Sequence, residues 1–204
     1  VIGASEDRGK FGGRLIFNLL HHGFRGRVYP INPKRRTILG HKAYSDIRYV
    51  PAPPDVAVLA VPANDLLAAL QGCVSSGVKV AVVITGQLAE TGHEGTRIEE
   101  EAVAIARAAD MRILGPNCLG ALNTASSVCL SPSVTMSVER LHKGYVGVVS
   151  QSGALQTAMF MRAFDAGIGF SSAITLGNQA DLELSDGFDY LVDDPETKAI
   201  LLYI

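Results

Sequence analysis

The sequence predicts an α/β protein with two domains, the second of which is incomplete. Short runs of Val, Ile, Leu and Ala recur along the chain, and helical patterns separate them. The runs are almost continuously apolar and do not alternate, as in parallel strands that helices cover on both faces. Strand and helix in alternation at this spacing are typical of a doubly wound parallel sheet.

The first domain is predicted over residues 1–122. Its opening stretch, VIGAS, has the pattern of the end of a buried strand. Further strands are expected at 27–31, 55–61, 78–85 and 111–115.

Three helices fit between these strands. The first is expected over residues 11–22, followed by a glycine that favours the conformation of a helix end. The second is expected to begin at Asn64, a preferred N-cap, and to end at Gly77. The third opens at Thr96, with Glu99 three residues later at the spacing of a capping box.

Residues 123–143 are rich in Ser and Thr and lack clean periodicity, so we expect a connection between domains. A second α/β domain begins at residue 144 and is cut short at 204. Its strands are expected at 145–150, 170–176 and 199–204, and its helices at 153–166 and 184–192. Because both ends resemble buried strands, we expect a piece of a longer polypeptide.

Composition limits the function. With 48% hydrophobic and 19% charged residues the chain buries a sizeable core, and its net charge of −2 does not suit a nucleic-acid-binding protein. No apolar run approaches the roughly 18 residues of a membrane span. The three cysteines have no metal-like spacing, which favours reduced thiols in a cytoplasmic protein without a metal site.

The loop at residues 3–13 indicates a nucleotide site. Gly3, Gly9 and Gly12 do not have the dinucleotide spacing G-x-G-x-x-G. A basic run at 34–36 stands where an NAD protein carries an acidic residue for the ribose. A nucleotide with an extra ribose phosphate, NADP or coenzyme A (CoA), fits better. The alternative is an ordinary glycine turn beside a solvated basic surface.

Ligands of such sheets bind at the carboxyl ends of the strands. Pro62, the stretch 84–86, and Asn117 in LGPNCLG follow successive predicted strands, so they are expected at that edge. Each is equally compatible with plain loop chemistry.

The turn after the strand at 145–150 carries two hydroxyls into a helix start. It either holds an anion at the helix N-terminus or presents Ser152 as a nucleophile. The nucleophile motif G-x-S-x-G needs glycine where Ser150 and Ala154 stand, so the sequence favours the anion.

Seven motifs in order resemble the α part of the NDP-forming acyl-CoA synthetases, which include ADP-forming acetyl-CoA synthetases and succinyl-CoA synthetase. The motifs are VIGAS, PINPK, VAVPA, ITG, LGPNCLG, GVVSQSGAL and LGN…D. Each motif alone is weak evidence for the family, but the order of all seven is specific. The resemblance covers essentially the whole chain. The resemblance implies a Rossmann-like CoA-binding domain followed by an incomplete flavodoxin-like domain.

The resemblance also implies site residues. CoA contacts fall on Ser5, Glu6, Asp7, Arg8, Lys34, Ile84, Thr85 and Gly86, and the patterns above add Gly3, Pro62 and Asn117. The phosphate of a phosphohistidine would lie on Ser150, Gln151, Ser152, Gly153 and Ala154. The family's histidine lies beyond Ile204, so no catalytic residue is expected in this chain. Thr157 stands where the succinyl-CoA branch carries a tyrosine that contacts substrate.

The implied reaction converts acyl-CoA, phosphate and ADP or GDP into an acid, CoA and ATP or GTP, through an acyl phosphate and a phosphohistidine. The nucleotide, with Mg, would lie on an ATP-grasp domain or β subunit, and an oligomer is expected. The C-terminal stretch also resembles protein lysine acetyltransferases that carry this region, so a CoA-sensing regulatory module is the alternative. A third option is a Rossmann-type domain for an unrelated nucleotide.

Overall fold

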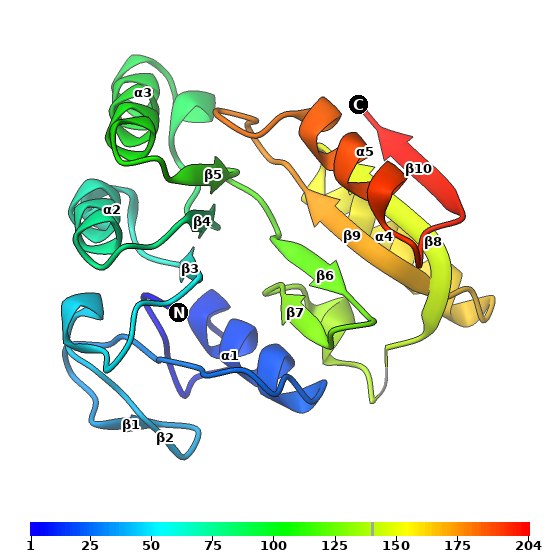
Figure 1. Cartoon of the computed structure of the whole chain (residues 1–204), viewed down its shortest axis with the longest axis horizontal. Helices are drawn as coiled ribbons and strands as arrows, with labels where there is room; N and C mark the ends of the chain where they lie inside the picture. The colour runs from blue at the N-terminus through cyan, green and yellow to red at the C-terminus, as the bar shows by residue number, and fades with distance from the viewer. Residues whose placement is uncertain (140) are drawn as a thin grey trace.

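The computed structural model describes residues 1–139 and 141–204, which contain two main sheets with their helices and a small two-stranded sheet, β1-β2 (Figure 1). The helices are α1 (Phe11–His21), α2 (Leu66–Ser75), α3 (His93–Ala108), α4 (Gly153–Asp165) and α5 (Leu184–Asp193). The strands are β1 (Thr37–Ile38), β2 (His41–Lys42), β3 (Val56–Leu59), β4 (Val80–Val83), β5 (Arg112–Leu114), β6 (Ala121–Asn123), β7 (Val128–Leu130), β8 (Lys143–Ser150), β9 (Phe170–Thr175) and β10 (Ala199–Tyr203).

The first sheet is parallel, in the order β3-β4-β5, as the continuous apolar runs predict. Beyond β3, Ile2 bridges to Leu59 on one side and to Ile31 on the other. The predicted strand at 27–31 is wrong as a regular strand, since only Ile31 forms bridges. Pro30 has no N–H to give to a ladder, which limits pairing there.

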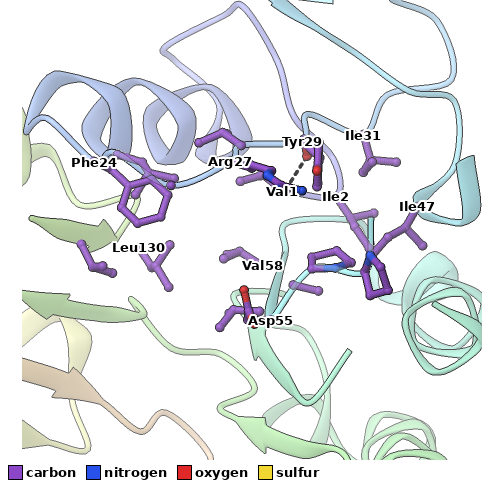
Figure 2. A pocket seen from close by; sticks show the side chains of 18 of the residues that line it. Val1, Ile2, Phe24, Arg27, Tyr29, Ile31, Ile47, Asp55, Val58 and Leu130 are labelled. Atoms are coloured by element: carbon purple, nitrogen blue, oxygen red, sulfur yellow. Dashed lines mark hydrogen bonds between the residues drawn. The ribbon is translucent and has the colours of Figure 1, made fainter. Parts of the chain in front are cut away.

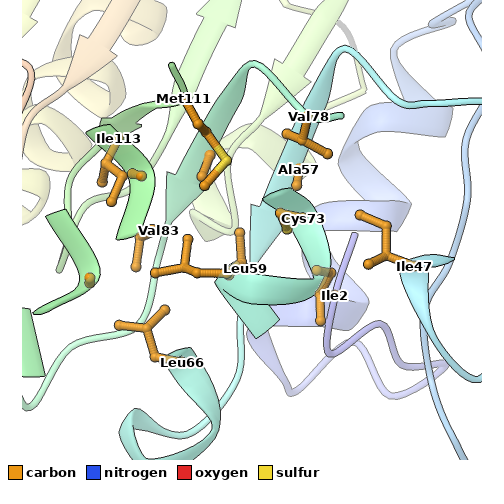
Figure 3. Close-up of a cluster of buried hydrophobic side chains, with 14 of the residues drawn as sticks. Ile2, Ile47, Ala57, Leu59, Leu66, Cys73, Val78, Val83, Met111 and Ile113 are labelled. Atoms are coloured by element: carbon orange, nitrogen blue, oxygen red, sulfur yellow. The ribbon is translucent and has the colours of Figure 1, made fainter. Parts of the chain in front are cut away.

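Helices cover both faces of this sheet, which confirms the doubly wound architecture. Ala57 and Leu59 point to the side of α2, where Leu66 is completely buried (Figure 3). Val58 points to the other side and packs in a cluster with Leu15 of α1. Burying each such leucine contributes about 1.5–3 kcal/mol, so alternation along β3 is what holds the helices in place.

The second sheet has the order β10-β8-β9-β6-β7. β10, β8 and β9 are parallel, whereas β6 runs antiparallel to both β9 and β7. The two faces are covered by Phe160 of α4, which packs near Val148, and by Leu191 of α5, which packs near Val149. This arrangement agrees with the expected flavodoxin-like start.

The segment predicted as a connection, 123–143, contains regular structure in its described residues 123–139 and 141–143. It begins inside β6, and β6 and β7 form a hairpin that extends the second sheet. Leu122 and Cys129 are buried at its centre, and Ser127 adopts a left-handed conformation in its turn. Strands of three residues are too short to show an alternation, so the sequence pattern does not reveal them.

Helix α1 begins and ends close to the predicted limits, and Gly23 has the expected positive φ of 80°. The prediction that Asn64 caps the second helix is wrong. Asn64 lies inside a 3₁₀ turn, Ala63–Asp65, and α2 begins only at Leu66. Because Asn64 is already part of the 3₁₀ turn, the N-cap position moves by one residue to Asp65, whose side chain makes no capping hydrogen bond.

The predicted capping box of the third helix is also wrong. Helix α3 begins at His93, so Thr96 is already helical and its hydroxyl donates to the Gly92 carbonyl. The Glu99 carboxylate accepts instead from the backbone N–H of Ala89, at 3.3 Å. Gly92 has a φ of 113°, which lets the chain enter the helix one turn earlier than expected.

The three cysteines are buried and free. Burial raises the pKa of each thiol to about 12, which makes them unreactive. Within residues 1–139 and 141–204, no helix is long and apolar enough to cross a membrane. The same residues contain no group of three or more His, Cys, Asp or Glu side chains that could hold a metal ion.

Candidate functional site

Glycines bring the start of α1 directly against the first strand end. Gly3 has a φ of 83°, and a Cβ there would lie 2.3 Å from the Ala60 carbonyl oxygen. A Cβ on Gly12 would lie 2.0 Å from the Gly3 carbonyl oxygen. Both positions therefore exclude any side chain. The helix N-terminus is left next to an exposed loop, which is the geometry that attracts phosphate groups.

The loop between them is shaped by its own side chains. The Ser5 hydroxyl accepts from the N–H of Asp7 at 3.0 Å, and the Asp7 carboxylate accepts from the N–H of Gly9 at 2.8 Å. Asp7 and the neighbouring Glu6 are exposed. The loop is thus ordered and accessible, as a ligand-binding loop should be.

Two arginines next to this loop have different positions. The Arg8 guanidinium lies 3.4 Å from the centre of the Phe17 ring, so its charge rests along α1. Arg14 donates to the carbonyl oxygens of Arg8 and Gly9, at 3.1 and 3.0 Å, and to that of Pro132 at 2.7 Å. The sequence analysis missed Arg14, because its partner Pro132 is distant in the chain.

A groove of about 480 Å³ opens at the same sheet edge, and Gly3, Pro33 and Pro62 are among its lining residues. Lys34 follows Pro33 and is exposed. Its backbone N–H donates to the Asn32 side chain at 2.8 Å, which fixes the turn that carries the lysine. Two predicted CoA residues, Gly3 and Pro62, therefore line this groove, and Lys34 directly follows a third lining residue, Pro33.

The other predicted CoA residues form a second group at the ends of β4 and β5. The Thr85 hydroxyl donates to the Val61 carbonyl at 2.8 Å, and the Asn117 N–H donates to the Thr85 carbonyl at 2.9 Å. A Cβ on Gly86 would lie 2.8 Å from the Asn117 side-chain oxygen. Ile84, which precedes them, is buried. These residues lie outside the lining of the groove.

A larger cavity, about 700 Å³, lies elsewhere (Figure 2). Arg27, Tyr29 and Asp55 line it, and Asp55 directly precedes the first residue of β3. It therefore opens toward the amino ends of the strands and contains none of the predicted site residues. Because ligands of parallel sheets bind at the carboxyl ends, we do not assign the site there.

The turn before α4 is built to expose a helix start. The buried Ser150 hydroxyl donates to the Ser152 carbonyl at 2.9 Å. The Ser152 hydroxyl accepts from the Leu155 N–H at 3.2 Å, so Ser152 is the N-cap of α4. A Cβ on Gly153 would lie 2.6 Å from the Leu119 side chain. This capping bond explains why a serine stands at position 152, so no role as a nucleophile is needed to account for it.

The remaining residues of this turn differ in what they offer an anion. The Gln151 N–H donates to the Tyr203 carbonyl at 3.0 Å, so only its exposed side chain is available. Ala154 is exposed in the first turn, where the N–H groups of a helix point outward. The Thr157 hydroxyl donates to the Gly153 carbonyl at 2.9 Å and lies 3.2 Å from the Ser133 hydroxyl.

Comparison with known proteins decides between the candidate ligands. Residues 1–124 match the family described as CoA binding domain, and residues 143–204 match the succinyl-CoA ligase like flavodoxin domain. The chain belongs to the CoA binding domain family. The match covers the glycine turn, the groove and both groups of predicted CoA residues.

Relatives of this CoA-binding chain are ADP-forming ligases. It is 41% identical to the acetate–CoA ligase [ADP-forming] II subunit alpha of Pyrococcus furiosus, over the whole chain and 43% of the relative. It is 39% identical to acetate–CoA ligase [ADP-forming] I of Archaeoglobus fulgidus, over the whole chain and 29% of the relative. The chain thus spans less than half the length of these curated relatives.

A solved structure shows the same arrangement. The dinucleotide forming acetyl-coenzyme A synthetase 1 of Ca. Korarchaeum cryptofilum, in complex with phosphate and ADP, matches with a TM-score of 0.94 and 39% identity. The match covers all of the CoA-binding chain and 43% of that protein. These relatives do not favour the alternative of an acetyltransferase regulatory module.

Two histidines of the CoA-binding domain hold the segment between the sheets. His21 lies 3.1 Å from the Val138 carbonyl oxygen and His22 lies 2.6 Å from that of Met136. Burial lowers the pKa of His22, although the Met136 carbonyl acts in the opposite direction. Both rings therefore serve a structural contact at the end of α1.

A buried carboxylate connects the CoA-binding domain to the second sheet. Asp181, whose side chain is 1% exposed, accepts from Arg107 at 3.0 Å, from Arg112 at 2.8 Å and from the Ile113 N–H at 2.8 Å. Burial raises the pKa of Asp181, but the Ile113 N–H and the two guanidinium groups outweigh it, and the net pKa is lowered. The aspartate of the motif LGN…D thus has a role in joining the domains.

Proposed function

We propose that this chain is part of the α portion of an NDP-forming acyl-CoA synthetase, an acid–CoA ligase. The observation that carries the proposal is the 41% identity to an ADP-forming acetate–CoA ligase α subunit along the whole chain. In this proposal residues 1–122 bind CoA and acyl-CoA, residues 123–143 connect, and residues 144–204 begin the phosphate-handling domain.

The proposed reaction converts acyl-CoA, phosphate and ADP or GDP into the free acid, CoA and ATP or GTP. It proceeds through an acyl phosphate and a phosphohistidine outside this chain. The nucleotide and its Mg would be bound by an ATP-grasp domain or β subunit. We place the assembled enzyme in the cytoplasm, as an oligomer.

The residues of this chain fit the binding of CoA phosphates. The close approach of Gly12 to Gly3 leaves the start of α1 open to an anion. The exposed ammonium of Lys34 supplies a charge for a phosphate at the neighbouring groove. Ser5, Glu6, Asp7 and Arg8 border this position, and Pro62 forms part of the groove wall. The proposed pantetheine path leads on to Ile84, Thr85, Gly86 and Asn117.

The start of α4 fits the binding of the phosphohistidine phosphate. The helix dipole and the N–H groups of Ser152, Gly153 and Ala154 attract an anion without a formal charge. The exposed Gln151 side chain completes the proposed phosphate site, and the buried Ser150 hydroxyl contributes by holding the turn through its bond to the Ser152 carbonyl. The chain's own part in the reaction is therefore to hold the CoA and the phosphate.

Calorimetric titration with CoA, dephospho-CoA and NAD tests the proposal. We expect CoA to bind more tightly than dephospho-CoA, because the latter lacks the ribose 3′-phosphate, and we expect NAD not to compete. Replacing Lys34 with Ala should weaken CoA binding by roughly 1–3 kcal/mol through loss of a charge-assisted contact. The matched control is Lys79→Ala, whose exposed ammonium pairs with Asp110. Binding of NAD without CoA would overturn the proposal.

A further inference from the structure

The side chain of Asn178, in the second domain, lies between the loop that follows β4 and the loop that follows β5. Asn178, in the loop from β9 to α5, donates from its amide to the carboxylates of Glu90 and Glu99, both at 2.8 Å. Its amide oxygen accepts from the Asn117 side chain at 3.3 Å. Its backbone N–H donates to the Pro116 carbonyl at 2.9 Å. Asn178 therefore contacts the first domain at four points.

The loops that Asn178 joins have unusual backbone conformations. Gln87 has a φ of 63° and Asn117 a φ of 55°, in the left-handed region. Such conformations are strained for residues other than glycine and persist only where their surroundings hold them. The Glu90 carboxylate accepts from the Gln87 N–H, so the partner of Asn178 also fixes Gln87. Gly86 lies close to the side chains of both Glu90 and Asn117, and it is predicted to line the CoA site.

The backbone that follows Asn178 is hydrogen-bonded to β5 and to the residue after it. The Ala180 N–H donates to the Gly115 carbonyl at 3.1 Å, and the Leu182 N–H donates to the Ile113 carbonyl at 3.1 Å. The loop thus runs along the free edge of β5. A change in the ends of β4 and β5 cannot leave this loop unaffected, because the two share these bonds.

We propose that Asn178 is a positioning residue that completes the CoA site from the second domain. It holds Gly86 and Asn117 in the conformation that accepts CoA, without touching CoA itself. This inference rests on the proposed function, since Gly86 and Asn117 are CoA residues only there. Linkage then requires that CoA also stabilises the loop of Asn178.

The test is CoA affinity in the whole chain. Asn178→Ala should raise the Kd for CoA by roughly 3- to 30-fold, the range for residues that act on a ligand through others. Asn178→Asp should raise it further, because a third carboxylate would face Glu90 and Glu99. The control is Asn123→Ala, which removes an amide hydrogen-bonded to Ser172 of β9 and Tyr190 of α5 and should leave the Kd unchanged.

A second variant and a second readout separate positioning from general stability. Glu99→Ala keeps the helix, since alanine favours it, and removes one partner of Asn178. Glu99→Ala should therefore weaken CoA binding, as Asn178→Ala does. In the unmodified chain CoA should slow amide hydrogen exchange at residues 178–182, and this protection should be lost in Asn178→Ala.

The outcomes are distinct. If the unmodified chain binds CoA and all the Asn178 and Glu99 variants bind it equally well, the inference is wrong and the proposed function stands. If the unmodified chain does not bind CoA, the proposed function fails and the inference fails with it. Weakened binding in these variants, with Asn123→Ala unaffected, supports both.

Discussion

Replacing Asp181 with Asn should destabilise the chain while preserving its shape. The carboxylate is almost fully buried and accepts three hydrogen bonds, from Arg107, Arg112 and the Ile113 N–H. An asparagine amide has one oxygen to accept with, and its NH₂ group would face a guanidinium donor. The substitution therefore removes the charge and leaves donors unpaired.

The magnitude follows from the three bonds. A hydrogen bond to a charged group contributes about 1.5–3 kcal/mol and a neutral one about 0.5–1.5, so losing the charge costs about 1 kcal/mol for each. The three bonds together give about 3 kcal/mol. Arg107 and Arg112 are 62% and 48% exposed, so water replaces part of what they lose. We expect a loss of about 2 kcal/mol in the free energy of unfolding.

Urea denaturation at pH 7 measures this loss as a lower midpoint with an unchanged slope. The matched control is Asp110→Asn, because the Asp110 side chain is 95% exposed and its ion pair with Lys79 should contribute at most about 1 kcal/mol. Equal midpoints for the two variants would refute the reasoning.

The pH dependence of this stability has a definite sign. The pKa of Asp181 is lowered from its usual 3.8 in the folded chain. Its stabilisation is therefore fully present above pH 3.8 and is lost as the pH falls through the folded pKa. The difference between the unmodified chain and Asp181→Asn should shrink in that acid range. A difference that stays constant down to pH 2 would contradict the role assigned to the charge.

Two further substitutions test the site geometry. Gly12→Ala places a methyl group 2.0 Å from the Gly3 carbonyl oxygen, so α1 must move and CoA binding should fall about tenfold; titration of the folded variant checks this. The control is Gly40→Ala, where a φ of 79° strains the backbone but no atom lies within 4 Å of the added Cβ; it should leave CoA binding unchanged. Ser152→Ala removes the cap on the Leu155 N–H and should cost about 1 kcal/mol of stability, measured by urea denaturation, whereas Ser152→Asp should retain most of it. A fluorophosphonate label on Ser152 would contradict its assignment as a cap.

The sequence predicted the strands of both main sheets correctly where a continuous apolar run marks them. The apolar runs that became β3, β4, β5, β8 and β9 are mostly buried, so their residue types alone predict strands. The run that became β10 does form a strand, but the expectation that it is buried is wrong, since Leu201, Leu202 and Tyr203 are exposed. Helix starts were predicted less well. Asn64 and Thr96 have the right chemistry for a cap, but the turn before each helix decides which residue is first, and it depends on contacts further along the chain.

The sequence by itself determined the order of the helices and of most of the longer strands, the glycine turn at Gly3 and the motifs that indicate CoA. These depend on residue type and short spacing, which fix backbone conformation and burial locally. Only the tertiary structure decided how the domains meet. Arg14 and Pro132 are 118 residues apart, and Asn178 and Glu90 are 88 apart. Such contacts follow from the way two sheets pack together, and no short pattern specifies the partner of a polar side chain at that distance.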